Sequence, residues 1–258
     1  MYDTATRQRA LDLHASGLTF SQVSRATGIS RSSIREWASG AVPSPRMTAE
    51  CPLRDGRLDP SRPPADYAYL LGLYLGDGCI SEGRREVHAL RIACCDAWPG
   101  LIDECERAVS AVMPHNKVNR VHAPGCTSVV STSKHWPCLF PQHGPGPKHL
   151  RPIVLAPWQQ AIVDAHPWEF LRGLIHSDGC RITNWTTRTV GGVTKRYEYP
   201  RYFFTNTSAD IIGLFTATLD AVGVQWKASI PRPTGQVNIS VARKDSVALM
   251  DAHIGPKH

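Results

Sequence analysis

The sequence predicts an α+β protein in which a duplicated unit of helices and strands follows a small all-α domain. The first observation is a repeat: residues 70–79 (LLGLYLGDGC) and 171–180 (LRGLIHSDGC) share six of ten positions at a constant offset of 101. The second is that the apolar pattern after each copy predicts the same order of helices and strands. The third is a series of helix-capping signals within residues 1–40.

The composition is typical of a soluble globular protein, with 258 residues, 42% hydrophobic residues and a net charge of +7. No apolar run approaches the roughly 18 residues of a membrane span, and the first residues lack a signal-peptide pattern. We therefore expect a cytoplasmic, nucleoid-associated protein with no membrane partner. The positive charge favours nucleic acid as the partner.

The N-terminal residues 1–40 are expected to form three short helices. The first covers residues 7–15. Thr19 and Gln22 then have the spacing of a capping box, in which each side chain satisfies a backbone donor of the other. Ser30 caps the third helix. This order resembles a helix-turn-helix DNA-binding domain.

In a helix-turn-helix, the third helix enters the major groove. It would present Arg31, Ser32 and Arg35 to DNA. A small helical cap without DNA contacts is the alternative. Residues 41–65 are rich in Pro, Arg, Ser and Asp, and this composition predicts a linker.

The rest of the chain divides into a first half, residues 66–150, and a second half, residues 151–258. Each half is predicted to contain the repeat helix, a strand pair, a helix, a second strand pair and a final helix. Strands are expected around residues 86–95, 117–122, 127–133, 181–187, 199–207, 225–230 and 236–242, and helices near residues 98–113, 209–222 and 245–253. The first hairpin of the second half is longer, with its tip over residues 187–196.

Small residues four apart lie on one face of each repeat helix: Gly72 with Gly76, and Gly173 with Ser177. Two such helices can pack with their backbones unusually close. They would bring two aspartates, one ending each repeat, to the negative ends of the helix dipoles. Such a pair calls for a divalent cation, which suggests metal-assisted hydrolysis of phosphodiesters. The alternative is that each Asp-Gly pair merely ends a helix.

Residues 70–78 and 171–179 resemble the two motifs of single-chain LAGLIDADG homing endonucleases. The resemblance implies a pseudo-two-fold duplicated αββαββα fold, with two saddle-shaped antiparallel sheets on duplex DNA, in a monomer that acts as a pseudo-dimer. It also implies that Mg²⁺ (or Mn²⁺) is bound by Asp77 and Asp178, with the carbonyls of Gly76 and Ser177 as further ligands.

The family commonly places a lysine near the metal. By this resemblance Lys148 and Lys257, each in a Gly-Pro-Lys-His sequence, are candidate catalytic residues. Asn206 is another, from the end of the second strand of its half. Cys94 occupies the corresponding position in the first half. His176 stands where the motif usually has an acidic residue.

The polar faces of the strands are expected to contact DNA, because Arg and Lys suit phosphates or guanine, and Asn and Gln suit adenine. The candidates are Arg91, Lys117, Asn119, Arg120, Arg181, Thr183, Trp185, Arg188, Arg196, Arg201, Lys227, Arg232, Gln236, Asn238 and Arg243.

The predicted function is therefore a homing-type, site-specific double-strand DNA endonuclease that requires divalent metal. The alternative is a non-cleaving DNA- or RNA-binding regulator, or a splicing helper, on the same scaffold. The eight cysteines include no Cys-x-x-Cys pair, and most are expected to be reduced. Residue types alone also allow a zinc site from His115, Cys126, His135 and Cys138, although their spacing matches no standard pattern.

Overall fold

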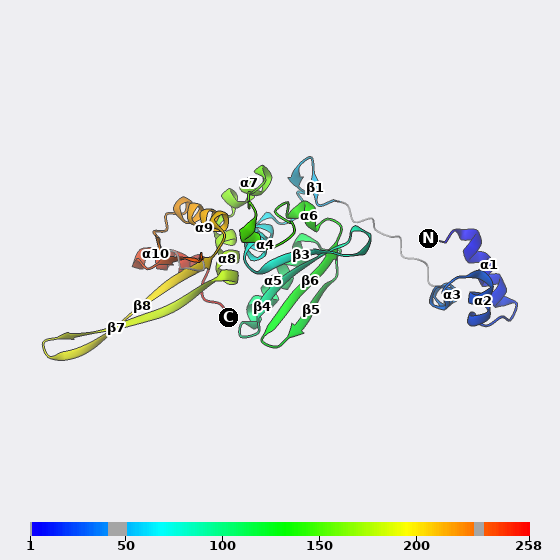
Figure 1. The fold of residues 1–258 in the computed structure, drawn as a ribbon, viewed down its shortest axis with the longest axis horizontal. Helices are drawn as coiled ribbons and strands as arrows, with labels where there is room; N and C mark the ends of the chain where they lie inside the picture. The colour runs from blue at the N-terminus through cyan, green and yellow to red at the C-terminus, as the bar shows by residue number, and fades with distance from the viewer. Residues whose placement is uncertain (1, 41–50, 230–234) are drawn as a thin grey trace. The chain divides into compact units, whose positions relative to one another are not determined.

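The computed structural model describes residues 2–40, 51–229 and 235–258. Figure 1 shows the course of the chain. It forms two compact units, Met1–Ala49 and Glu50–His258, and each is described here by itself. None of the described helices is long and apolar enough to cross a membrane.

The N-terminal unit is a three-helix domain made of α1 (Thr4–Ala15), α2 (Phe20–Thr27) and α3 (Arg31–Ala38). The predicted capping box begins α2, where the Thr19 backbone N–H donates to Gln22 Oε1 at 2.8 Å. Gly28 ends α2 with a φ of 72°, a left-handed conformation that suits glycine. The small core consists of Ala10, Val23, Ile29 and Ile34.

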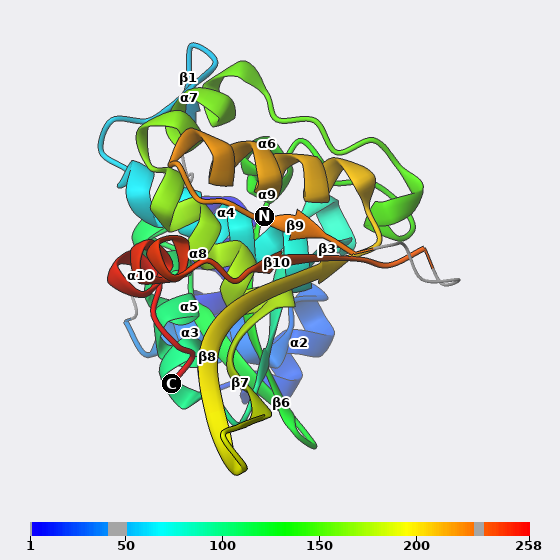
Figure 2. The same ribbon diagram turned by 90° about the vertical axis from the view of Figure 1, so that its left-hand side faces the viewer.

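The larger unit is centred on two helices, α4 (Pro64–Asp77) and α8 (Pro167–Asp178). They lie side by side between the two sheets, as Figures 1 and 2 show. A side chain could not fit between their backbones: a Cβ at Gly72 would lie 2.5 Å from the Phe170 carbonyl oxygen, and one at Gly173 would clash with the Tyr69 carbonyl. The close packing predicted from the small residues is confirmed.

The first half builds a four-stranded antiparallel sheet in the order β3-β4-β6-β5. Its strands are β3 (Gly78–Glu82), β4 (His88–Cys95), β5 (Val118–Ala123) and β6 (Cys126–Ser133). Helix α5 (Pro99–Val112) packs against β4 and β6, and the short α6 (Trp136–Leu139) follows β6. Two 3₁₀ turns, η1 (Arg84–Glu86) and η2 (Lys148–Leu150), complete this half.

The second half repeats this plan with the sheet order β7-β8-β10-β9. Its strands are β7 (Gly179–Val190), β8 (Val193–Asn206), β9 (Lys227–Ala228) and β10 (Val237–Val241), and its helices besides α8 are α7 (Pro157–Ala165), α9 (Ala209–Ala221) and α10 (Lys244–His253). The registers correspond, because Gly78 pairs with Ile92 in one half and Gly179 pairs with Phe204 in the other.

Three local features differ from the predictions or add to them. The longer hairpin of the second half is confirmed, but its strands extend through residues 187–190 and 193–196, and Gly191 and Gly192, with φ of 58° and 78°, form the whole turn. The predicted linker contains a two-stranded ribbon, β1 (Leu53–Arg54) and β2 (Arg57–Leu58). Helix α7 was not expected at all.

Candidate metal and nucleic-acid site

The two motif aspartates meet where α4 and α8 end. Asp77 is the last residue of α4, and Asp178 is the last residue of α8. A Cβ at Gly76 would lie 3.3 Å from Oδ2 of Asp178 and would clash with the Ser177 side chain. The absence of a side chain at Gly76 therefore lets the carboxylates of the two halves approach each other.

The electrostatics of this pair are unfavourable without a cation. Burial and, to a smaller extent, the charge of Asp178 together raise the pKa of Asp77 to about 6, although Asp77 is exposed to solvent. Burial also raises the pKa of Asp178. Within the part of the chain that the structure describes, no hydrogen bond contributes to the pKa of Asp77. The carboxylates are thus only partly compensated by the protein.

Lys148 is held at the end of α4 by three backbone carbonyls. Its Nζ donates to the carbonyl oxygens of Tyr74, Gly76 and Gly78 at 2.5, 2.7 and 2.9 Å. Burial lowers the pKa of Lys148 to about 8, while the two aspartates act in the opposite direction. Arg151 holds the preceding loop by donating to the Gly146 carbonyl at 2.5 Å. Lys148 is therefore a positioned ammonium group beside the aspartates.

Lys257 occupies the related position of the second half. Its Nζ donates to the Ser177 carbonyl at 3.0 Å, and burial lowers its pKa. The two Gly-Pro-Lys-His segments also share a backbone conformation, since Gly146 and Gly255 have φ of 75° and 71°. The sequence repeat is thus a repeat in structure, with one lysine near each aspartate.

Asn206 lies beside Asp178. Its amide donates to Asp178 Oδ2 at 2.6 Å, and its own Oδ1 accepts from the Ser208 backbone N–H at 2.7 Å. The strand registers place Cys94 at the same position of the first half, because each residue is two beyond the partner of the motif glycine. Cys94 is 2% exposed, and its thiol interacts with that of Cys105. The residue at this register is therefore an amide that donates to the aspartate in the second half, and a buried thiol in the first half.

The donor set fits a hard divalent cation. It consists of two carboxylates and the carbonyl oxygens of Gly76 and Ser177, and Mg²⁺ and Mn²⁺ prefer oxygen ligands. Each carbonyl accepts a lysine hydrogen bond and retains a second lone pair. Burial and the charge of Asp178 raise the pKa of Asp77, and a bound cation would offset both effects.

Some predicted DNA contacts lie on the exposed faces of the sheets, away from the helices. Arg91 and Asn119 both stand directly opposite Val130, so these three residues form a row across the open face of the first sheet. On the second sheet, a hollow of about 480 Å³ is lined by residues of β8, β10 and β9 and by residues that flank β9 and β10. The predicted contacts that line it are Arg201, Lys227, Asn238 and Arg243.

Arg120 and Arg181 correct the prediction, because both turn toward helices. Arg120 donates to Glu106 and Asp103 of α5, each at 2.7 Å. Arg181 donates to both carboxylate oxygens of Asp251 in α10 at 2.6 and 2.8 Å. Alternation along a strand explains the error, since residues one apart point to opposite faces.

The same alternation places further predicted contacts on the Arg181 side of the long β7–β8 hairpin: Thr183, Trp185 and Arg196. Arg196 lies over the Trp185 ring at 4.8 Å. Arg188 lies on the opposite side, near the hairpin turn. Lys117 is exposed before β5, and Gln236 is half-buried before β10. Arg232 lies outside the described residues.

In the N-terminal unit, the predicted contact residues Arg31, Ser32 and Arg35 are all exposed on α3. Ile34 of the same helix is buried in the core of that domain. Arg35 also lies over the Phe20 ring at 5.6 Å. The helix therefore buries one face and leaves a basic face open.

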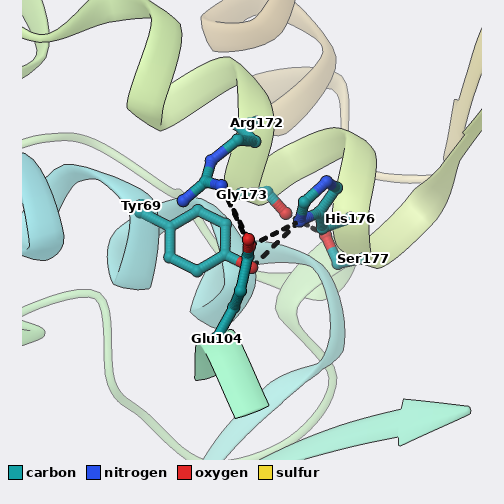
Figure 3. Close-up of polar contacts among 6 residues, drawn as sticks. All are labelled: Tyr69, Glu104, Arg172, Gly173, His176 and Ser177. Carbon is teal, nitrogen blue, oxygen red and sulfur yellow. Dashed lines mark hydrogen bonds and ion pairs between the residues drawn. The ribbon is translucent and has the colours of Figure 1, made fainter. Parts of the chain in front are cut away.

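Sequence reasoning missed a polar cluster between the halves, drawn in Figure 3. Arg172 of α8 donates to both carboxylate oxygens of Glu104 in α5, at 3.1 and 3.0 Å, and its guanidinium lies 4.3 Å from the Tyr69 ring centroid. The Tyr69 hydroxyl is hydrogen-bonded to His176 Nδ1 at 2.9 Å. Burial lowers the pKa of His176 to about 4, so its ring is neutral at neutral pH. The cluster joins α5 to both central helices.

Comparisons with known proteins bear on the fold of both units. Residues 1–41 match the family model described as a homeodomain-like domain. No curated protein matches the chain. Three solved structures are similar to it. I-DmoI in complex with DNA and Mn has a TM-score of 0.50 and 14% identity, covering 76% of this chain and 98% of its own. The structure of mesophilic variants of the homing endonuclease I-DmoI has a TM-score of 0.50 and 15% sequence identity, and the match covers 74% of this chain and 96% of that one. The LAGLIDADG meganuclease I-AabMI bound to uncleaved DNA has a TM-score of 0.48 and 11% sequence identity, and the match covers 72% of this chain and 82% of that one.

The larger unit therefore has the fold of the LAGLIDADG homing endonucleases, with two four-stranded antiparallel sheets around a central helix pair. The three helices of the N-terminal unit are similar to a homeodomain-like domain. The predicted fold class is confirmed.

Proposed function

We propose that this chain is a site-specific double-strand DNA endonuclease of the homing type. One observation supports this proposal most strongly: Asp77 and Asp178, which end helices of different halves, lie close together. Lys148 and Lys257 are held beside them by hydrogen bonds to backbone carbonyls. A protein that only packs its helices has no need for two crowded carboxylates. We further propose the boundaries 1–40 for the helix-turn-helix domain, 41–65 for the linker, and 66–150 and 151–258 for the two halves.

In this proposal Asp77 and Asp178 hold Mg²⁺ or Mn²⁺, with the carbonyls of Gly76 and Ser177 as additional ligands. The cation, when bound, polarises the scissile phosphate and lowers the pKa of water. The protein's own groups supply the rest: Lys148 and Lys257 place positive charge where charge builds on phosphate oxygens. Asn206 fixes the orientation of Asp178 through its amide.

Duplex DNA would lie along the open faces of the two sheets. Arg91 and Asn119 would contact it from the first sheet, and the residues around the hollow on the second sheet would contact the other half of the target. Because the two hairpins differ in length, the target is expected to be asymmetric. One chain carries both halves, so the enzyme is proposed to act as a monomer, with the helix-turn-helix domain extending the target.

The test is cleavage of a plasmid library by the full chain, with and without Mg²⁺ or Mn²⁺. We expect metal-dependent linear products at a small number of sequences. Asp77→Asn and Asp178→Asn variants should still shift duplex DNA in a gel but should not cleave it. Asp164→Asn is the matched control, because this aspartate lies on α7 and accepts a hydrogen bond from Gln160 on the same helix.

A non-cleaving DNA- or RNA-binding regulator, or a splicing helper, is the second candidate. The helix-turn-helix domain favours it, since this domain can recognise DNA without any nuclease. Binding of duplex DNA without cleavage in any divalent metal would support this candidate and reject the nuclease. Cleavage by both aspartate variants at the wild-type rate would instead reject the assigned site.

A further inference from the structure

A second group of metal-ligating side chains lies apart from the motif aspartates. The ligand atoms of Cys51, His135 and Cys138 all lie within 4.8 Å of one another. All three residues are half-buried, and both cysteines are free thiols. The thiols interact directly: burial raises the pKa of Cys138, and Cys51 raises it further. Of the zinc ligands considered from residue types, His115 and Cys126 are not part of this group, and Cys51 was not foreseen.

Two of the ligands stand on a rigid support. His135 is the N-cap of α6, and the backbone N–H of Cys138 donates to its carbonyl at 3.1 Å, which closes one helical turn. Residues three apart on such a turn share a face. The turn is anchored by Trp136, which is fully buried and donates to the Ser131 carbonyl at 3.0 Å.

The third ligand comes from a distant part of the chain. Cys51 lies two residues before β1, and 84 residues before His135 (135 − 51). The ribbon is closed beside it by the Asp59 backbone N–H, which donates to the Pro52 carbonyl at 2.8 Å. Helix α4 begins shortly after the ribbon, at Pro64. A metal ion bound by Cys51 and by the two ligands on α6 would therefore hold the segment that leads into α4 against the rest of the first half.

We propose that Cys51, His135 and Cys138 bind one Zn²⁺ ion, with water in the fourth position. Two thiolates and an imidazole are a borderline-soft set that suits zinc and is poorly suited to Mg²⁺. With Zn–S distances of about 2.3 Å and Zn–N distances of about 2.0 Å, tetrahedral ligand atoms lie about 3.5–3.8 Å apart. The present spacing of at most 4.8 Å therefore needs a closure of roughly 1 Å, a small movement for half-buried side chains.

The role of this ion is structural. A metal that joins segments far apart in sequence stabilises the folded chain, because no such site exists in the unfolded state. It lies outside the set of residues proposed for cleavage, so zinc binding and nuclease activity can succeed or fail separately.

The experiment measures zinc in the full-length protein, purified under reducing conditions without a metal-affinity tag and dialysed against metal-free buffer. We expect about one zinc per chain by elemental mass spectrometry. Cys51→Ser, Cys138→Ser and His135→Asn should each weaken zinc binding by about 10–100-fold or more in a competition titration. Cys126→Ser and His115→Asn are the matched controls and should retain zinc, as should Asp77→Asn.

Cobalt substitution of the wild-type protein gives a readout that does not depend on how the variants fold. Co²⁺ bound by the two thiolates should give a charge-transfer absorption, and added Zn²⁺ should abolish it. The proposal is overturned if the reduced wild-type chain takes up neither ion while both thiols react with a thiol reagent. It is equally overturned if Cys51 and Cys138 form a disulfide in the protein purified from a reducing cytoplasm, or if Cys126→Ser loses zinc as Cys138→Ser does.

Discussion

Asn206 donates its amide to Oδ2 of Asp178 at 2.6 Å, whereas the residue at the same register in the first half, Cys94, is a buried thiol. The two halves therefore support their motif aspartates differently. Asp178 has one oxygen fixed by a neutral donor, which lowers its pKa against the effect of burial. Among the residues that the structure describes, no hydrogen-bond donor lowers the pKa of Asp77 in this way. The pseudo-symmetric site is chemically unequal.

This inequality predicts the effect of removing the amide. Asn206→Ala should reduce DNA cleavage by about 10–100-fold, the usual cost of losing a residue that orients a metal ligand. DNA affinity should stay unchanged, which separates positioning from binding. Asn116→Ala is the control, because its amide donates to the Thr132 carbonyl on the first sheet. If Asn206→Ala cleaved DNA at the wild-type rate, the Asn206 amide would not be needed to orient the Asp178 carboxylate.

Binding of divalent metal should weaken as pH falls. Asp77 has a folded-state pKa of about 6, above its ordinary value of 3.8, so between these values the folded protein holds more protons than the unfolded chain. The stability of the metal-free protein should therefore fall as pH rises through this window. A cation competes with that proton, so the rise in Tm on adding Mg²⁺ should be larger near about pH 7 than near about pH 5.

The matched variant for this prediction is Asp77→Asn. It removes the repulsion and should raise the metal-free stability at neutral pH, by at most about 1 kcal/mol after screening by solvent. Its Tm should respond little to Mg²⁺ at either pH. An identical Mg²⁺ response in wild type at both pH values would contradict the assignment.

The two lysines should differ in their structural importance. Lys148→Met removes three hydrogen bonds to backbone carbonyls and should lower the free energy of unfolding by about 1–3 kcal/mol. Lys257→Met removes one such bond and should cost about 1 kcal/mol. Urea denaturation in the absence of metal measures both. If Lys257→Met lowered the free energy of unfolding more than Lys148→Met does, the number of carbonyl hydrogen bonds would not determine the relative stability of the two variants.

The helix interface predicts opposite effects of adding one methyl group. Gly72→Ala and Gly173→Ala place a Cβ into the backbone of the opposing helix and should each cost about 1–3 kcal/mol or more. Gly213→Ala is the matched control within α9, because a Cβ there meets nothing within 4 Å. It should stabilise the protein by up to about 1 kcal/mol through helix propensity. Thermal denaturation of the three variants compares them directly.

Arg91 and Arg120 test which face of the first sheet contacts DNA. Arg91→Ala should weaken DNA binding and reduce the salt dependence of the affinity by about one unit if it contacts a phosphate. Arg120→Ala should leave affinity unchanged, because the Arg120 guanidinium is paired with Asp103 and Glu106. Fluorescence anisotropy at several salt concentrations measures both effects. Equal losses of affinity would place DNA elsewhere.

The parts of the fold that follow from local pattern could be predicted from the sequence. The Gly72–Gly76 spacing predicted a close helix pair, and the Thr19–Gln22 spacing predicted the start of α2. The length of β7 and β8 was also accessible in principle, since Gly191-Gly192 is a typical two-residue hairpin turn. By contrast, strands as short as β1 and β2 have no periodicity to detect.

What could not be predicted depends on register and on long-range contact. Arg120 was predicted as a DNA contact together with its neighbour Asn119 on residue type alone, although adjacent residues of a strand point to opposite faces. Glu104 pairs with Arg172, 68 residues away, and no local pattern links them. The same holds for Cys51 and Cys138, which only the folded chain brings together.

The approach of Gly72 to Gly173 also limits how chimeric proteins could be assembled from chains with this fold. A transplanted half brings its own central helix, and a single larger side chain at the level of either glycine would push the helices apart. Separation there would also widen the gap between Asp77 and Asp178, which end the same helices. Recombination between such chains therefore has to transfer α4 and α8 as a matched pair, while the sheets that they carry can diverge to suit new targets.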